Sequence, residues 1–381
     1  MLNLIGYSLP IVKTIIYPNT IKRISDKPGY ENSQLANENE NTILERVILS
    51  ENLEYIGGGA FLNCYKLSEL RIPNSVTSIG GKAFCGCNAL TNIEIPNNIT
   101  NIEYATFSGC SSLTSLKIPN SVINIGNSAF SKCSGLKSIE IPNSVTNIED
   151  GAFSECNSLI SIKIDEGNVV YDSRNNCNAI IKTSTNVLFQ GCNNTIIPNG
   201  IIRVENGAFK GCSGLTSIEI PNSITSIGKG AFEGCSGLKS IEIPNNIEKI
   251  EEDTFAYCSN LASVIISDSV TSIGNSAFWY CVGLSNIIIP NSVTIIEDYA
   301  FCGCNNLTNI EIPSSVSNLG SNVFASCNNL IDIKVDANNK VYDSRNNCNA
   351  IIKTSTNVLI KGCKNTVVPN TVTSIGNSAF E

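Results

Sequence analysis

One motif recurs along most of this chain, and Ile220–Ile243 (IPNSITSIGKGAFEGCSGLKSIEI) shows it in regular form. Its phenylalanine returns every 23 residues in two blocks, at 61, 84, 107, 130 and 153 and then at 209, 232, 255, 278, 301 and 324. From 153 to 209, and from 324 to 380, the step is 56, which is one ordinary unit plus one of 33. Because a fixed period of this size is typical of repeats that bury their apolar faces by stacking, it predicts a solenoid of coils.

Each coil contains a short strand segment and a turn. The alternation at Leu238, Ile241 and Ile243 predicts a strand, which ends at Pro244 because proline has no N–H to donate to a ladder. We therefore expect one short strand per coil, joined to its neighbours in a parallel sheet.

The other side of the coil is expected to be less regular. A second apolar pair, such as Ile224 and Ile227, predicts either a second short strand or a helical turn. The small residues around Ala231 and Phe232 favour one tight helical turn. The position after the second isoleucine is glycine in seven coils and glutamate in five, so we expect glycine there to be tolerated and a positive φ not to be required.

Two coils, Asp165–Ile197 and Asp336–Val368, are 33 residues long and share the identical segment VYDSRNNCNAIIKTSTNVL at 170–188 and 341–359. Its second half predicts two short strands about a polar turn, a β-hairpin that replaces the helical turn. The identity has two explanations, a selected site or the recent duplication of a 171-residue block, and we favour duplication.

The ends of the chain depart from the motif. Residues 1–43 are interpreted as a degenerate N-terminal coil with a polar excursion at 27–41, and residues 44–381 as the solenoid. The first residues lack the features of a signal peptide. The sequence stops at Phe380–Glu381, before the cysteine that the period requires, so we expect the array to be truncated at its C-terminus.

Composition excludes several classes of function. The chain has no histidine, which excludes His-dependent catalysis and His-ligated zinc, and its net charge of −8 argues against nucleic acid and anionic membranes as partners. No apolar run is long enough to insert into a membrane. Asp172 beside Arg174, and Asp343 beside Arg345, are better explained as polar turn residues than as an acid and its stabiliser. No loop has the ligand spacing of an EF-hand. We predict no catalytic, cofactor-binding or metal site.

Seventeen cysteines would suggest disulfides in a small secreted protein, but eleven of them stand three residues after the repeat phenylalanine. Stacked coils would place these thiols in a buried column of small hydrophobic groups. We therefore expect reduced structural cysteines, with disulfide or redox chemistry considered only at Cys85/Cys87 and Cys302/Cys304.

The motif IPNSVTSIGxxAFxGCSGLxSIxI, together with YDSRNNCNAIIKT, closely resembles the BspA-like leucine-rich repeat family from about Leu44 onward. The resemblance implies a right-handed leucine-rich-repeat solenoid without catalytic residues, found in surface or secreted proteins. It also implies an adhesin-type module that binds host matrix or plasma proteins. An intracellular scaffold or structural spacer is the alternative function, since this chain shows neither a signal sequence nor an anchor.

Recognition is expected on the outward row of the strand, because inward residues are committed to packing. From coil to coil this row reads Ile48, Arg71, Glu94, Lys117, Glu140, Lys163, Ile196, Glu219, Glu242, Ile265, Ile288, Glu311, Lys334 and Val367. The alternating signs from Arg71 to Lys163 are interpreted as a ladder that avoids self-repulsion. The adjacent pair Ile265 and Ile288 is the candidate protein-binding patch, although β-branched residues also simply favour strands. The candidate site is completed by Glu242, Glu311, Trp279 and Tyr280.

Overall fold

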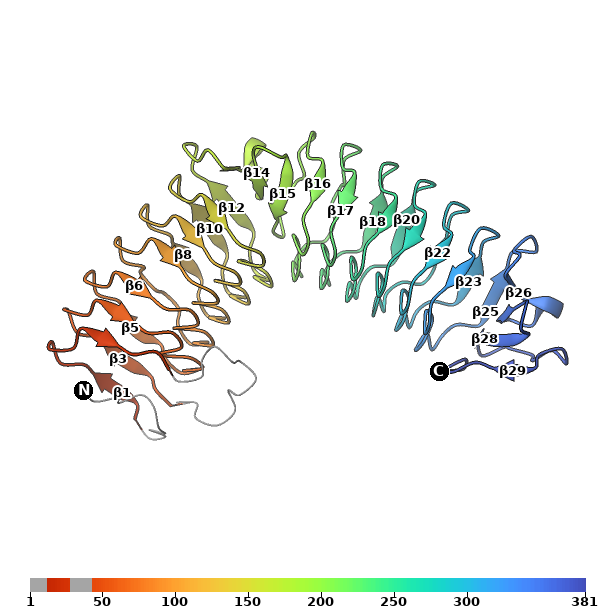
Figure 1. The fold of residues 1–381 in the computed structure, drawn as a ribbon, viewed down its shortest axis with the longest axis horizontal. Coiled ribbons are helices and arrows are strands. Elements are labelled where there is room, and N and C mark those ends of the chain that lie inside the picture. Colours follow the sequence, from red (N-terminus) through yellow and green to blue (C-terminus); the bar gives the residue numbers. More distant parts are fainter. Residues whose placement is uncertain (1–11, 28–42) are drawn as a thin grey trace. The chain divides into compact units, whose positions relative to one another are not determined.

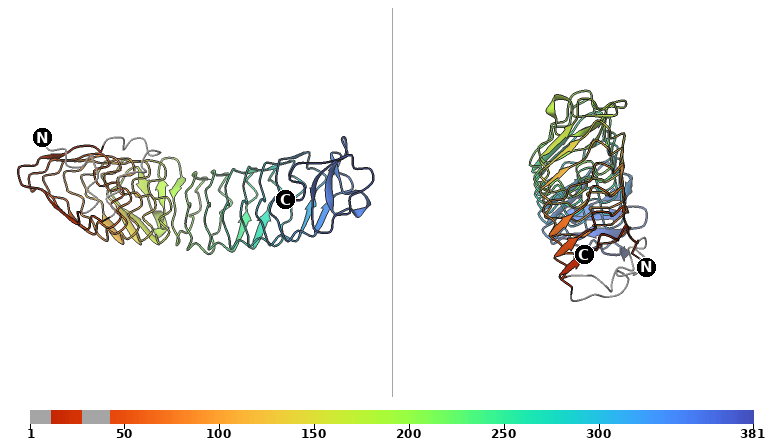
Figure 2. Two further views of the ribbon diagram at one scale, coloured as in Figure 1. Left: turned by 90° about the horizontal axis from the view of Figure 1, so that it is seen from below. Right: turned by 90° about the vertical axis from the view of Figure 1, so that its left-hand side faces the viewer.

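The computed structural model describes residues 12–27 and 43–381, and in them the chain forms a parallel β-solenoid whose coils carry short strands. Two compact units are present. The first runs to Thr185 and includes Gln190–Thr195, and the second comprises Asn186–Phe189 and Ile196–Glu381. In each unit, successive coils lie side by side in chain order (Figures 1 and 2).

The first ladder is built from the predicted strands. In the first unit these are β1 (Thr14–Ile16), β3 (Arg46–Ile48), β5 (Glu69–Arg71), β8 (Ser115–Lys117), β10 (Ser138–Ile141) and β12 (Ser161–Ile164). In the second unit they are β18 (Ser240–Ile243), β20 (Ser263–Ile266), β23 (Asn309–Ile312) and β25 (Asp332–Val335). Paired strands are parallel, and Glu140 faces Lys163, 23 positions later, so the register of the sheet is the period of the sequence.

A second ladder is built from strands of two residues, apart from the four-residue β15, which confirms the second-strand alternative. In the first unit these are β2 (Arg23–Ile24), β4 (Tyr55–Ile56), β6 (Ser78–Ile79), β7 (Asn101–Ile102), β9 (Asn124–Ile125) and β11 (Asn147–Ile148). The second unit contains β15 (Val187–Gln190) except for its last residue, together with β16 (Arg203–Val204), β17 (Ser226–Ile227), β19 (Lys249–Ile250), β21 (Ser272–Ile273), β22 (Ile295–Ile296), β24 (Asn318–Leu319) and β29 (Ser374–Ile375).

The N-terminal coil stacks on the first regular coil with a longer offset. Thr14 pairs with Arg46 and Arg23 pairs with Tyr55, a distance of 32 residues along the chain. The extra nine residues correspond to the excursion predicted at 27–41, whose conformation falls almost wholly outside the described residues.

The segment around the repeat phenylalanine differs from the expected helical turn. Within the described ranges, helix is restricted to the 3₁₀ segments η2 (Arg174–Asn176) and η3 (Arg345–Asn347). Around Phe130, Ser128 and Lys132 have φ values of 56° and 61°, so the chain makes successive tight turns. These left-handed residues aim alternate N–H groups at the next coil, where the Phe130 N–H donates to the Ala152 carbonyl at 2.8 Å. A helical turn would have directed them back into its own coil.

The repeat phenylalanines form two stacked columns in the core. Ring centroids of successive members lie 5.4–5.5 Å apart from Phe61 to Phe153, and 4.9–5.6 Å apart from Phe209 to Phe324. All of these rings are buried. Residues one period apart therefore occupy equivalent places, as the period predicts.

The cysteine column lies beside the phenyl rings and is hydrogen-bonded to the backbone. The Cys235 thiol donates to the Phe209 carbonyl of the preceding coil at 3.1 Å, and Cys258 and Cys281 repeat this contact with Phe232 and Phe255. All seventeen cysteines are free, including the CxC pairs Cys85/Cys87 and Cys302/Cys304. The thiol column is thus a structural part of the core.

The glycines after the second isoleucine have the backbone conformation that we expected, since none has a positive φ. The inference that glycine is merely tolerated there is wrong, because the neighbouring backbone leaves little space for a side chain. A Cβ on Gly80 or Gly320 would lie 2.4 Å from backbone of the preceding coil. At Gly126 and Gly376 the nearest backbone atoms would lie 3.0 and 3.1 Å from such a Cβ, so the crowding differs from coil to coil.

The phenyl column predicts a large penalty for truncation. We expect Phe232→Ala to reduce the free energy of unfolding of the second unit by about 3–5 kcal/mol, because it removes a buried ring and its stacking contacts with both neighbouring rings. Denaturant unfolding monitored by circular dichroism would measure this. The exposed control Ile288→Ala should change stability by less than about 0.5 kcal/mol, and an equal effect of both changes would contradict the column as the core.

The thiol column predicts loss of stability at alkaline pH. Burial raises the pKa of Cys258 to about 12, and burial also raises the pKa values of Cys235 and Cys281 well above their usual range. A cysteine thiol in the unfolded chain has a pKa of about 8.5, so the folded state holds its proton more tightly. The resulting contribution to the free energy of unfolding is fully present below about pH 8.5 and is lost as the pH rises toward 12. Each thiol contributes up to about 1.4 kcal/mol per pH unit to this fall.

The measurement is the urea midpoint as a function of pH between 8 and 11. The variant Cys235→Ala/Cys258→Ala/Cys281→Ala should be less stable at neutral pH but should lose stability less steeply above pH 9. Tyrosine and lysine ionisation is common to both proteins, so parallel pH profiles would refute this role of the thiols.

Candidate functional site

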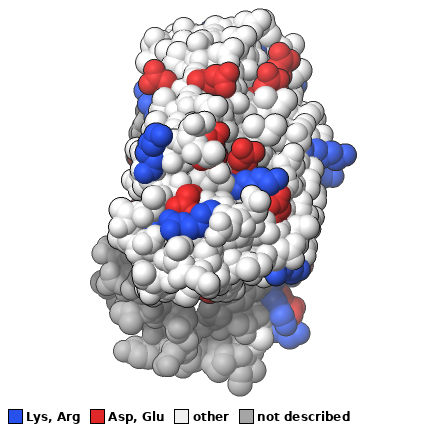
Figure 3. Space-filling model, turned by 90° about the vertical axis from the view of Figure 1, so that its right-hand side faces the viewer, with Lys and Arg blue, Asp and Glu red and all other residues white. Residues whose placement is uncertain are grey.

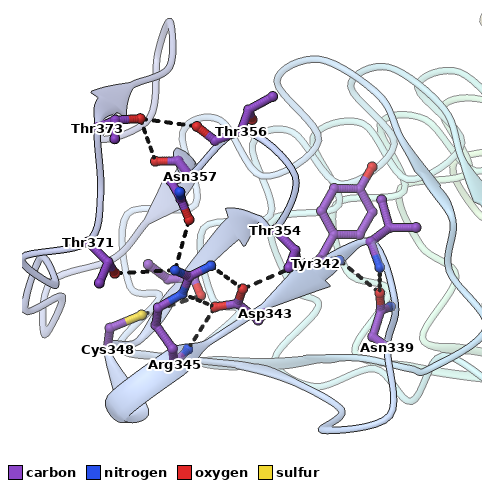
Figure 4. A network of polar contacts seen from close by, with 12 residues as sticks. Asn339, Tyr342, Asp343, Arg345, Cys348, Thr354, Thr356, Asn357, Thr371 and Thr373 are labelled. Carbon is purple, nitrogen blue, oxygen red and sulfur yellow. Dashed lines mark hydrogen bonds and ion pairs between the residues drawn. The ribbon is translucent and has the colours of Figure 1, made fainter.

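The second 33-residue coil, Asp336–Val368, carries a network of polar contacts (Figure 4). β26 (Tyr342–Asp343) pairs antiparallel with β27 (Ala350–Lys353), and β27 with β28 (Val358–Gly362), which confirms the predicted hairpin. The Arg345 guanidinium donates to both oxygens of Asp343, at 2.7 and 2.5 Å. It also donates to Asn357 Oδ1 at 2.9 Å, and the Thr354 hydroxyl donates to Asp343 at 3.2 Å.

The charged groups of this network are paired with each other within the same coil. Burial by itself raises the pKa of Asp343, but hydrogen bonds from Arg345 and Thr354 outweigh burial and hold the pKa below its ordinary value. The copy in the first unit behaves in the same way, because Arg174 and Thr183 hydrogen-bond to Asp172. A carboxylate kept ionised by its own neighbours is a poor proton donor. The Asp–Arg pair therefore has a structural role, in which it holds the hairpin in place.

The same coil terminates the second ladder of the coils before it. It has no ordinary second strand to accept the Leu319 N–H, and the Tyr342 hydroxyl accepts that hydrogen bond at 3.0 Å. The Asn339 amide donates to the Pro313 and Val316 carbonyls, at 2.8 and 2.9 Å. In the first unit, Tyr171 and Asn168 make the equivalent contacts with the preceding coil. Much of the identical segment therefore has a structural role.

The outward row of the strands is exposed at every predicted position. Glu94, Glu140 and the lysines between and after them face each other in register, as the alternating charges predict. Figure 3 shows one face of the molecule, where acidic and basic side chains are mixed among uncharged ones. That arrangement differs from the continuous basic stripe of a nucleic-acid site.

The predicted isoleucine patch lies on the first ladder of the second unit. Ile265 in β20 is 58% exposed and pairs with Glu242 in β18. Ile288 is 76% exposed and lies outside the assigned strands, between β21 and β22, and Glu311 lies in β23. These four residues thus belong to one outward row, one residue per coil.

Trp279 and Tyr280 come from a different side of the coil. They follow Phe278 in the tight-turn segment, where the Tyr280 N–H donates to the Cys302 carbonyl of the next coil at 2.8 Å. Their ring partner is Tyr257, whose centroid is 5.1 Å from that of Trp279 and 5.8 Å from that of Tyr280. The sequence analysis missed Tyr257, although it stands one period before Tyr280.

Neither a metal centre nor a membrane span is found in the described part of the chain. No three cysteine or carboxylate side chains gather there in a group able to hold a metal ion. The same residues include no helix with the length and apolar character needed to cross a bilayer.

Comparison with known proteins identifies the repeat. The model of the BspA type leucine rich repeat region matches residues 12–89, 36–160, 182–287 and 269–381, which is most of the chain. This chain belongs to the BspA-type leucine-rich repeat family. Its repeats form a scaffold related to bacterial surface proteins with leucine-rich repeats.

Solved structures show the same fold. A leucine-rich cell surface protein from Faecalibacterium prausnitzii is 28% identical with a TM-score of 0.59, and the match covers 83% of each chain. A leucine-rich repeat protein from Eubacterium ventriosum is 23% identical with a TM-score of 0.62, and the match covers 82% of this chain and 90% of that one. A search of curated proteins gave no match.

The hydrogen bond from the Leu319 N–H to the Tyr342 hydroxyl can be tested by substitution. We expect Tyr342→Phe to lower the free energy of unfolding by about 1–3 kcal/mol, because the partly buried Leu319 N–H loses its acceptor while the ring stays. Urea denaturation would measure the change. Tyr299→Phe removes a hydroxyl that accepts an exposed hydrogen bond from Asn322 and should be nearly neutral. A neutral Tyr342→Phe would show that the hydroxyl is dispensable.

Proposed function

We propose that this protein is a non-enzymatic binding module that recognises another protein through the outward row of the second unit. The observation that supports this is the adjacent pair Ile265 and Ile288, which are 58% and 76% exposed on a ladder whose other side is a packed core. Exposed β-branched residues on a rigid surface lose little conformational freedom on binding and gain by being removed from water. Glu242 and Glu311 flank them and would set the polar rim of the contact.

The cell surface is the proposed location, with host matrix or plasma proteins as partners. This proposal is supported by the Faecalibacterium relative, which is described as a cell surface protein. A rigid repeat scaffold that presents an extended row of side chains suits a macromolecular partner better than a small substrate, which needs a concave site.

The test is binding to a panel of purified extracellular-matrix and plasma proteins by surface plasmon resonance. We expect Ile265→Lys/Ile288→Lys to weaken binding at least tenfold, because two lysines would have to be desolvated at the contact. Circular dichroism and the melting temperature should be unchanged, since both positions face solvent.

A matched control is available in the same unit. Ile196 and Val367 occupy the same outward position and are 73% and 72% exposed, so Ile196→Lys/Val367→Lys adds the same charge at a distance from the patch. Equal loss in both variants would indicate a general charge effect and remove the patch. Absence of any partner from the panel would favour a structural spacer.

A further inference from the structure

Three aromatic rings from two adjacent coils meet on the turn side of the second unit. Tyr257 and Tyr280 stack at 5.8 Å with 23° between their planes, and Trp279 stands nearly edge-on to Tyr280 at 5.5 Å. The two tyrosines are 44% and 41% exposed, and Trp279 is half-buried. We call Tyr257, Trp279 and Tyr280 the aromatic surface.

The core does not require tyrosine at these positions. Tyr257 and Tyr280 stand two residues after the repeat phenylalanine and have φ values of 60° and 54°. Five coils use glycine in this column, at 86, 109, 211, 234 and 303, where the left-handed conformation is free of strain. A bulky side chain in this conformation costs free energy, and nearly half of each tyrosine remains exposed to water. Their placement is therefore better explained by contact with a ligand than by stability.

An acidic residue, Asp253, stands four positions before Tyr257 in the same tight-turn segment. The Ala256 N–H donates to the Asp253 carbonyl and closes the turn that leads to Tyr257. Burial raises the pKa of Asp253, and the nearby carboxylates of Glu233 and Glu252 raise it further. Lys210 and Lys229 pair with those two glutamates at 2.7 and 2.9 Å, whereas among the described residues Asp253 has no ion-pair partner.

The chain itself shows how such rings are used in its first unit. The Arg23 guanidinium lies 4.3 Å from the centroid of Tyr55, and the Lys82 ammonium lies 5.2 Å from that of Tyr104. These contacts place a cation on the electron-rich face of an aromatic ring. In the second unit, the described residues place no lysine or arginine over Tyr257, Trp279 or Tyr280 in this way.

We propose that the aromatic surface binds an arginine side chain of a basic partner protein, with Asp253 as its counter-charge. The planar guanidinium stacks on aromatic faces and is more weakly hydrated than an ammonium group, so it suits a half-exposed ring better than lysine does. The net charge of −8 attracts a basic partner at long range and repels an acidic one. This surface belongs to the turn ladder and does not depend on the isoleucine patch.

The chain contains a single tryptophan, so the emission of Trp279 reports directly on this surface. The probe is a glycine-rich heptapeptide with two arginines, titrated at 0.15 M salt, and its control is the same peptide with citrulline in place of arginine. We expect a saturable change in emission with the arginine peptide and at least tenfold weaker binding of the citrulline peptide. Equal binding of the two peptides, or no saturable binding of the arginine peptide, overturns the proposal.

Variants then locate the site, with binding measured by anisotropy of a labelled peptide. Tyr257→Gly/Tyr280→Gly keeps the left-handed backbone and removes both rings, so it should weaken binding about tenfold. The melting temperature should change little, because relief of backbone strain offsets the lost ring contacts. Asp253→Asn should weaken it several-fold, and less so at high salt. Lys132→Gly changes the same column in the first unit and should leave binding unchanged.

Two further arms separate the alternatives. The variant Ile265→Lys/Ile288→Lys should bind the arginine peptide like the unmodified protein, so failure of the isoleucine patch and failure of this site are distinguishable. A saturable emission change with neutral oligosaccharides, and none with the arginine peptide, would show that the ligand is a sugar and would refute the proposal. Retained peptide binding by the double glycine variant would do the same.

Discussion

Hydrogen bonding between residues one period apart is the constraint on which the rest of this structure depends. A single coil of 23 residues has too few apolar groups to form a core, and each of its strands is too short to be stable alone. Three ladders, on the two sets of strands and on the tight turns, hold successive coils in one register. That register places phenyl rings over phenyl rings and each thiol against the carbonyl of the preceding coil.

The two 33-residue coils show what happens when the register is interrupted. They have neither the repeat phenylalanine nor an ordinary second strand, so they cannot continue the ring column or accept every ladder hydrogen bond. Side chains supply the missing acceptors and donors, through Tyr171 and Asn168 in one copy and Tyr342 and Asn339 in the other. The boundary between the two compact units falls within the first of these coils, at residues 186–195.

The separation of each coil into buried and exposed positions determines where a binding surface can form. Inward positions are occupied by the core, and the Asp–Arg pairs of the long coils are consumed in fastening the hairpin. The outward strand row and the outward turn positions remain, and they differ in chemistry. The strand row of the second unit presents aliphatic side chains and carboxylates, whereas the turn side presents the aromatic rings of Tyr257, Trp279 and Tyr280. Two surfaces on one rigid scaffold would allow a partner to be held at more than one point.

The sequence by itself determined the solenoid, its register, the buried phenyl and thiol columns and the outward row, because each follows from residues that repeat at one interval. It also determined the hairpin of Asn349–Leu359, whose two apolar runs flank a polar turn. Only the tertiary structure decided the rest. Tight turns replace the expected helical turn because the N–H of Phe130 must reach the next coil, and glycine at 80 and 320 is required by the approach of the neighbouring backbone. Likewise, Trp279 and Tyr280 join Tyr257 on the turn side, because the side of a coil on which a residue lies depends on how the chain closes around the core.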